Sequence, residues 1–108
     1  MNKQNNGLTE AYSYILFALA EPMHGYGIMQ KVVQMSKSSV NLGPGTLYGA
    51  LTNMQKKEWI EMAPSDEARR KNYQLTALGQ QVVEDEVSRI QLLQAAATAS
   101  LKQIKGNE

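Results

Sequence analysis

The chain has 108 residues, with no cysteine and a single histidine, His24. The lack of cysteine excludes disulfides, thiolate zinc sites and cysteine nucleophiles together. A transition-metal site needs more ligands than one histidine supplies, so we expect no metal and no cofactor, and we interpret His24 as the start of a helix. The absence of cysteine is also typical of a reducing compartment, and we expect a cytoplasmic protein.

Long apolar runs are also missing. The most apolar segment, residues 11–20 (AYSYILFALA), is too short to span a bilayer. Lys3 is the only basic residue before this segment, whereas a signal peptide has a positively charged region before its apolar run. We therefore expect a core helix at residues 11–20 and no membrane partner.

Motifs of common enzymes are absent as well. Neither G-x-G-x-x-G nor the G-K-[ST] of nucleotide-binding loops occurs. Residues 84–86 (EDE) are three consecutive acids, which fan around a helix instead of pairing in a cleft, and we expect them to be solvated. Without a nucleophile beside a base, we do not expect an enzyme.

The net charge of +1 hides an uneven distribution. Residues 22–76 carry seven Lys or Arg and four Asp or Glu, a net charge of +3, whereas the segments before and after each have a net charge of −1. A local basic excess steers a domain toward phosphates. An ordinary solvated surface is the alternative explanation.

Helical periodicity dominates the first third of the chain. Apolar residues from Leu8 to Leu19 recur at the spacing of one helical face, with Thr9 as a suitable N-cap. The alanines of this segment keep its other side apolar, so we expect the helix to be buried on more than one face. A second helix is expected from His24 to about Ser36.

A third helix is expected to begin with Pro44, a residue favoured in the first helical turn. Residues 44–57 contain no Asp or Glu. A helix that enters the major groove of DNA needs small groups for close approach and donors for base edges and phosphates. The alternative is that its glycines pack against a neighbouring element. The candidate DNA contacts of this helix combine small, hydroxyl, amide, aromatic and basic residues: Gly45, Thr46, Tyr48, Gly49, Thr52, Asn53, Lys56 and Lys57.

Two short strand-like segments follow, at residues 59–62 and 69–76, with a turn at residues 64–68. The second arm opens with Arg69, Arg70 and Lys71. Three helices followed by a basic hairpin are the layout of a winged helix-turn-helix, a mainly α (α+β) fold, and the wing cations would reach phosphates or the minor groove. Three basic residues at a turn are also compatible with simple solvation.

The remainder of the chain predicts one long helix from Ala77, with Thr76 as its N-cap and a heptad seam that suits dimerisation. We therefore divide the chain into a winged helix-turn-helix domain (1–76) and a C-terminal dimerisation helix (77–108). The first and last helices are expected to share the dimer core. The predicted interface residues are Tyr12, Ile15, Leu16, Leu19, Val83, Val87, Ile90, Gln94, Ala97, Leu101 and Ile104.

Three stretches, HGYGIMQ (24–30), LGPGTLYGALTNM (42–54) and RRKNYQLTALG (69–79), strongly resemble the PadR family of bacterial transcriptional regulators. The resemblance implies a homodimeric winged-helix repressor on a palindromic operator, relieved in some members by a small-molecule inducer, often phenolic or a drug. It also implies that residues 45–49 lie in the recognition helix and that residues 69–71 lie at the wing. The chain departs from the family at Glu58, where a turn glycine is usual.

Two functional classes are therefore open. The first is a sequence-specific DNA-binding repressor that acts as a homodimer. The second is a winged-helix module that docks on another protein without specific DNA binding, because a fold alone does not decide function. The acid-free outer face of residues 44–57 favours DNA.

Overall fold

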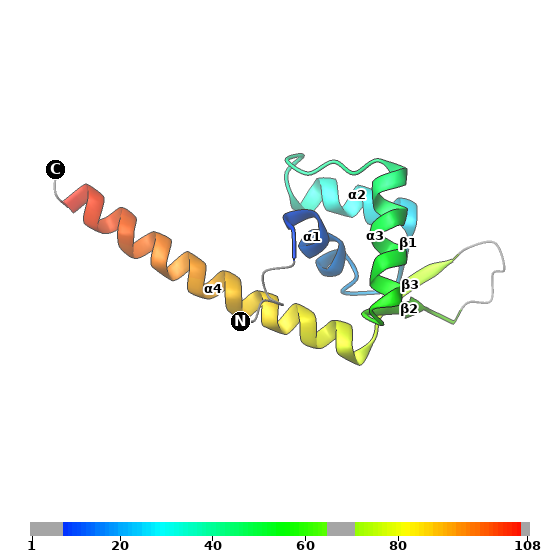
Figure 1. The fold of residues 1–108 in the computed structure, drawn as a ribbon. Helices are drawn as coiled ribbons and strands as arrows, with labels where there is room; N and C mark the ends of the chain where they lie inside the picture. The colour runs from blue at the N-terminus through cyan, green and yellow to red at the C-terminus, as the bar shows by residue number, and fades with distance from the viewer. Residues whose placement is uncertain (1–7, 65–70, 107–108) are drawn as a thin grey trace.

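The structure is a computed structural model that describes residues 8–64 and 71–106. Three short helices and a small antiparallel sheet form one body, and a long helix projects from it, so that the molecule measures 61 × 31 × 21 Å (Figure 1). The elements are α1 Glu10–Ala18, β1 Met23–His24, α2 Gly25–Met35, α3 Pro44–Lys56, β2 Ile60–Met62, β3 Asn72–Leu75 and α4 Ala77–Gly106. The winged helix-turn-helix prediction is confirmed.

Polar side chains fix the starts of three helices. Thr9 Oγ1 accepts the N–H of Tyr12 at 3.2 Å, and His24 Nδ1 accepts the N–H of Gly27 at 3.1 Å. Thr76 Oγ1 accepts the N–H of Gly79 at 3.0 Å. Each bond satisfies one of the backbone donors that a helix leaves unpaired at its start. These contacts confirm the helix starts predicted at Thr9, His24 and Thr76.

The end of α3 explains how the chain turns into the wing at Glu58. The N–H of Trp59 donates to the carbonyl of Met54 at 2.9 Å, and the N–H of Glu58 donates to the carbonyl of Gln55 at 2.9 Å. This pair of bonds is a Schellman motif, which requires a left-handed residue after the C-cap. Glu58 has φ 64° and takes that conformation without being glycine.

The core lies between α1, α2 and α3. Leu47, Leu51 and Met54 of α3 are buried in it, as their spacing predicted. Ile15 and Leu16 of α1 are 0% exposed and belong to the same cluster, together with Leu19. These three α1 residues leave no surface for a partner chain, so we assign them to the core and not to the dimer interface.

The sheet has three strands in the order β1–β3–β2, one more than the predicted two-stranded wing. The extra strand pairs Met23 with Tyr73 and His24 with Asn72. A two-residue strand is too short to show an alternating pattern in the sequence. Its formation also depends on pairing with β3, which lies almost fifty residues further along the chain. Strand β1 ties the start of α2 to the base of the wing.

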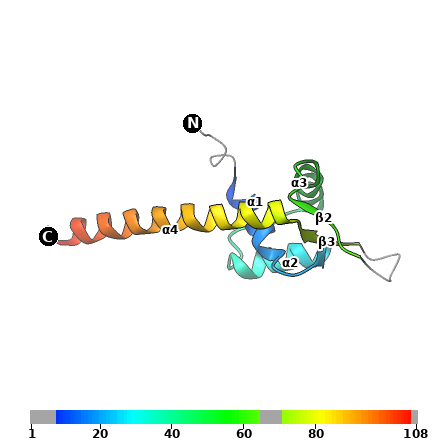
Figure 2. The same cartoon turned by 90° about the horizontal axis from the view of Figure 1, so that it is seen from below.

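Helix α4 crosses the body beside α1 and continues well beyond it (Figure 2). Its Glu86 is buried, 3% exposed, which corrects the expectation that all of residues 84–86 are solvated. The Ser13 hydroxyl donates to Glu86 Oε2 at 2.6 Å. Arg89 donates to both carboxylate oxygens of Glu86, at 2.9 and 2.8 Å. A buried carboxylate is tolerated when its charge is paired in this way.

Candidate nucleic-acid interface

The outer face of α3 is exposed and unusually open at its glycines. A Cβ atom added to Gly45 or to Gly49 would have no protein atom within 4 Å. The glycines therefore do not pack against a neighbouring element, which removes the alternative explanation for them. Glycine in a helix costs roughly 1 kcal/mol relative to alanine. Nothing within the described protomer offsets that cost at either position.

The polar residues of α3 differ in what they can offer a ligand. Thr52 Oγ1 donates to the carbonyl of Tyr48 at 2.9 Å, so its proton is used within the helix. Thr52 as a residue remains exposed. Thr46 lies in the first turn and is exposed. Asn53 Nδ2 donates to the hydroxyl of Tyr12 at 2.9 Å, which links a predicted DNA contact to a predicted interface residue across α3 and α1.

Tyr48 lies across the gap between α3 and α2. A Cβ atom on Gly25 would lie 2.6 Å from Tyr48 Cζ and 2.9 Å from Tyr48 Cε1, and it would collide with the hydroxyl. Gly25 therefore provides the space in which the Tyr48 ring lies, although 45% of Tyr48 remains exposed. Sequence reasoning assigned no role to Gly25, and its only signal was its place in the HGYG stretch.

Burial, together with the nearby Tyr48, raises the pKa of Tyr73 on β3. The Tyr73 phenol therefore remains a neutral hydrogen-bonding group around neutral pH, because even an unshifted phenol ionises only near pH 10. Nearby, the Asn72 side-chain oxygen is buried without a hydrogen-bond partner among the described residues. The two phenols place polar groups between α3 and β3.

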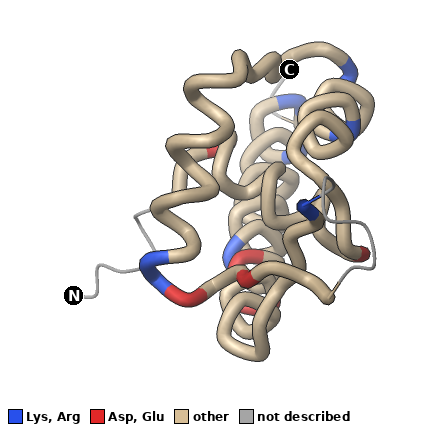
Figure 3. Tube along the Cα trace, turned by 90° about the vertical axis from the view of Figure 1, so that its right-hand side faces the viewer, with Lys and Arg blue, Asp and Glu red and all other residues tan. Residues whose placement is uncertain are grey.

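Basic residues flank α3 at its C-terminal end and at the wing. Lys56 and Lys57 are exposed, and Lys57 Nζ lies 5.4 Å from the centre of the Trp59 ring. Lys71 is exposed just before β3, whereas Arg69 and Arg70 lie outside the described residues. Figure 3 shows the described basic residues spread over several elements and not gathered in one patch.

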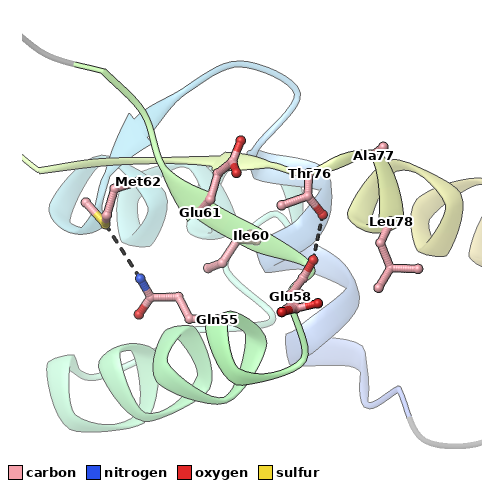
Figure 4. A pocket seen from close by; sticks show the side chains of 8 residues that line it. All are labelled: Gln55, Glu58, Ile60, Glu61, Met62, Thr76, Ala77 and Leu78. Atoms are coloured by element: carbon pink, nitrogen blue, oxygen red, sulfur yellow. Dashed lines mark hydrogen bonds between the residues drawn. The ribbon is translucent and has the colours of Figure 1, made fainter.

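A hollow of about 620 Å³ lies where the end of α3 meets β2 and the start of α4 (Figure 4). Its apolar lining includes Met62 and Leu78, which are 41% and 48% exposed. Two carboxylates, from Glu58 and Glu61, also line it. A ligand in this hollow would touch the end of α3 and the start of α4 at the same time.

Other kinds of site find no support in the part of the chain that the structure describes. Within residues 8–64 and 71–106, no three acidic, histidine or cysteine side chains gather closely enough to hold a metal ion. None of the described helices combines the length and apolar character needed to cross a membrane.

A small three-helix body, a β2–β3 wing and an open, acid-free third helix define the class of winged helix-turn-helix DNA-binding proteins. The model of the transcriptional regulator PadR-like family matches residues 15–85. The chain therefore belongs to the PadR-like family of transcriptional regulators. Members of this family are regulators and not enzymes.

The chain is also similar to individual proteins. An uncharacterised 37.1 kDa protein in a transposon of Streptomyces fradiae is 36% identical over 78 residues, which are 71% of this chain but only 22% of that protein. A PadR-like regulator from Bacillus cereus matches with a TM-score of 0.71 at 23% identity, covering 84% of this chain and 90% of that one. A PadR family regulator from Clostridium difficile gives 0.70 at 24% identity, covering 86% and 99%. These two structures show the fold.

Proposed function

We propose that this transcriptional regulator is a repressor that binds a palindromic operator as a homodimer, with α3 in the major groove. The observation that carries the proposal is the open space at Gly45 and Gly49 on a helix without acidic residues. Glycine there lets a DNA backbone or base edge approach α3 closely, and the absence of carboxylates avoids repulsion by phosphates. In a dimer, two such helices about 34 Å apart would read successive major grooves.

The homodimer proposal is supported by an apolar face of α4 that is covered only in its first half. Near its start, Val83 and Glu86 face the body of their own protomer. The same helical face continues toward the C-terminus with no described residue of the chain upon it. We call this continuation the α4 stripe: Ile90, Leu93, Ala97, Leu101 and Ile104.

The leucines and isoleucines of the α4 stripe are 38–60% exposed. Exposed apolar surface on this scale marks an interface, and a second copy of the chain matches it by symmetry. Val87 and Gln94 flank the stripe.

The docking-module alternative is less well supported. A protein-docking face is usually centred on exposed apolar side chains. Among the residues of α3, only Tyr48 is a large apolar side chain with substantial exposure. The rest of its outer face consists of glycines, hydroxyls, an amide and lysines, which suit a polar and negatively charged ligand.

A small-molecule effector forms the last part of the proposal. The hollow beside Glu58, Glu61, Met62 and Leu78 is a candidate site because it adjoins both α3 and α4. Its two carboxylates and apolar lining suit a cation with an apolar body. A Leu78→Trp variant would fill the hollow and abolish any thermal shift that such a compound gives with the unaltered protein.

The proposed function is tested by a gel shift with DNA from upstream of the protein's own gene. We expect a discrete complex that survives an excess of random DNA at physiological salt. The matched control is Gly49→Glu, which places one negative charge on α3 at a position where the Cβ atom meets no protein atom within 4 Å. It should abolish the complex while the protein stays folded. Equal competition by random DNA, or a variant that binds as well as the original, would contradict the proposal. A complete lack of DNA binding would favour the docking module.

A further inference from the structure

Two anchors along α4 fix its direction relative to the DNA-binding body. The first is at Gly79, where an added Cβ atom would lie 3.0 Å from the carbonyl carbon of Trp59 and would collide with its oxygen. The second is the buried hydrogen bond from Ser13 to Glu86, two turns further along the helix. Two contacts about 10 Å apart, at 1.5 Å per residue, define the axis of a rod.

The second anchor is polar although its surroundings are largely apolar. Ser13 and Glu86 are 6% and 3% exposed, beside the half-buried Val82 and Val83. A buried ion pair is weak evidence for stability, since an apolar replacement of similar size is often neutral or stabilising. It does restrict geometry, because a 2.6 Å hydrogen bond and the two-bond fork of Arg89 hold only one arrangement. Apolar contacts such as those of Val82 tolerate sliding.

A small change in the angle between α4 and the rest of the protein moves the C-terminal end of the helix by several ångströms. A helix of 30 residues is about 45 Å long. A pivot of about 5° near its start would move its other end by about 4 Å, close to the 3.4 Å rise of one base pair. Most of the α4 stripe, from Leu93 to Ile104, lies in the distal half of the helix. The direction of α4 would therefore set how far apart a dimer holds its two recognition helices.

We propose that Glu86, held by Ser13 and Arg89, is a positioning residue that sets the half-site spacing that the dimer accepts. This inference rests on the proposed homodimeric DNA binding. It assigns the buried carboxylate a role in selectivity between operators in addition to what its charge contributes to the stability of the fold. Its consequence is that spacing selectivity can be lost while folding and affinity for single half-sites are kept.

The test compares the original protein with a Ser13→Ala/Glu86→Met double variant. Because the sequence has no cysteine, Gln34→Cys on α2 and Gln103→Cys on α4 allow two spin labels in one protomer. Labelled chains diluted with unlabelled ones report the α2–α4 distance within a protomer, whether or not it dimerises. The matched control is Asp85→Ala, which removes the exposed Gln81–Asp85 hydrogen bond of α4 without reaching α1.

We expect a narrow distance distribution for the original protein and for Asp85→Ala, and a broader or shifted one for the double variant at a melting temperature within about 5 °C. In a selection from duplexes with varied half-site spacing, the double variant should accept spacings that the original protein rejects. A distance distribution and spacing preference that match the original would overturn the inference. If the distribution broadens but the original protein selects no DNA, the proposed function and the spacing role fail, while the control of the helix angle stands.

Discussion

The aromatic ring of Tyr48 on α3 lies beside Gly25 at the start of α2, where an added Cβ atom would collide with the ring unless the ring moved. We therefore expect Gly25→Ala to displace the ring and to weaken operator binding by about 1–2 kcal/mol, or roughly ten-fold. Binding to random DNA should change less. The measurement is fluorescence anisotropy with operator and random duplexes.

A double-mutant cycle checks the physical reason. If Gly25 acts through Tyr48, then Gly25→Ala should cost little in a Tyr48→Ala background, because the collision is gone. Fully additive losses in affinity would show that Gly25 acts independently of Tyr48.

This contact also shows where sequence reasoning ended. Periodicity, N-caps and the family resemblance predicted the three helices, the wing and the long α4, because these depend on neighbours a few residues apart. The contact between Gly25 and Tyr48 depends on how two helices cross, which one sequence does not specify. Strand β1 was missed because its partner strand lies far along the chain. The hydrogen bond between Ser13 and Glu86 was missed for the same reason, because these two residues are 73 positions apart.

Charge patterning was misleading at Glu86 in a way that has a physical explanation. Three consecutive acids point in three directions around a helix, 100° apart. Two of them are exposed, but the third points at α1. The residues predicted to contact DNA on α3 are all exposed, as such a role requires, yet which of them contact bases stays a prediction.

Gly49 separates stability from DNA binding. Gly49→Ala should raise the free energy of unfolding by about 0.5–1 kcal/mol, because alanine favours helix and its Cβ meets no protein atom. The same change should weaken operator binding, since the methyl group would stand between α3 and the DNA. Thermal melting and a binding titration measure the two effects. A variant that is stabilised and binds DNA with unchanged affinity would remove Gly49 from the interface.

Glu58 offers a stabilising substitution at a residue that is not itself a proposed DNA contact. Because its φ of 64° is unfavourable for a residue with a side chain, Glu58→Gly should raise the free energy of unfolding by about 1 kcal/mol. Lys37→Gly is the matched comparison, since Lys37 ends α2 with φ 52° in the same kind of motif. Denaturant unfolding measures both. A loss of stability in both variants would show that the left-handed conformation carries no strain that glycine relieves.

Acid should weaken the attachment of α4 to the body. The hydrogen bonds from Arg89, opposed by burial and aided by Ser13, lower the pKa of Glu86 below its ordinary value of 4.5. A carboxyl group with a lowered folded pKa stabilises the protein above its unfolded pKa, and this stabilisation is lost as the pH falls through the folded pKa. Between about pH 7 and pH 3, the free energy of unfolding should therefore fall more steeply for the original protein than for Glu86→Gln. Parallel curves would mean that Glu86 is not preferentially ionised in the folded state.

The α4 stripe predicts at which leucine an introduced charge disrupts the dimer. Leu101, 52% exposed, lies on the stripe, whereas Leu92 is 74% exposed but lies on a different face of the helix. Leu101→Glu should dissociate the dimer, since a buried unpaired carboxylate at an interface costs several kcal/mol. Leu92→Glu should leave the dimer intact although it replaces the more exposed leucine. Sedimentation velocity distinguishes the two species, and dissociation by Leu92→Glu alone would move the interface to the other face of α4. Because operator binding is proposed to need both recognition helices, only Leu101→Glu should also abolish the discrete gel shift while leaving weak binding to DNA.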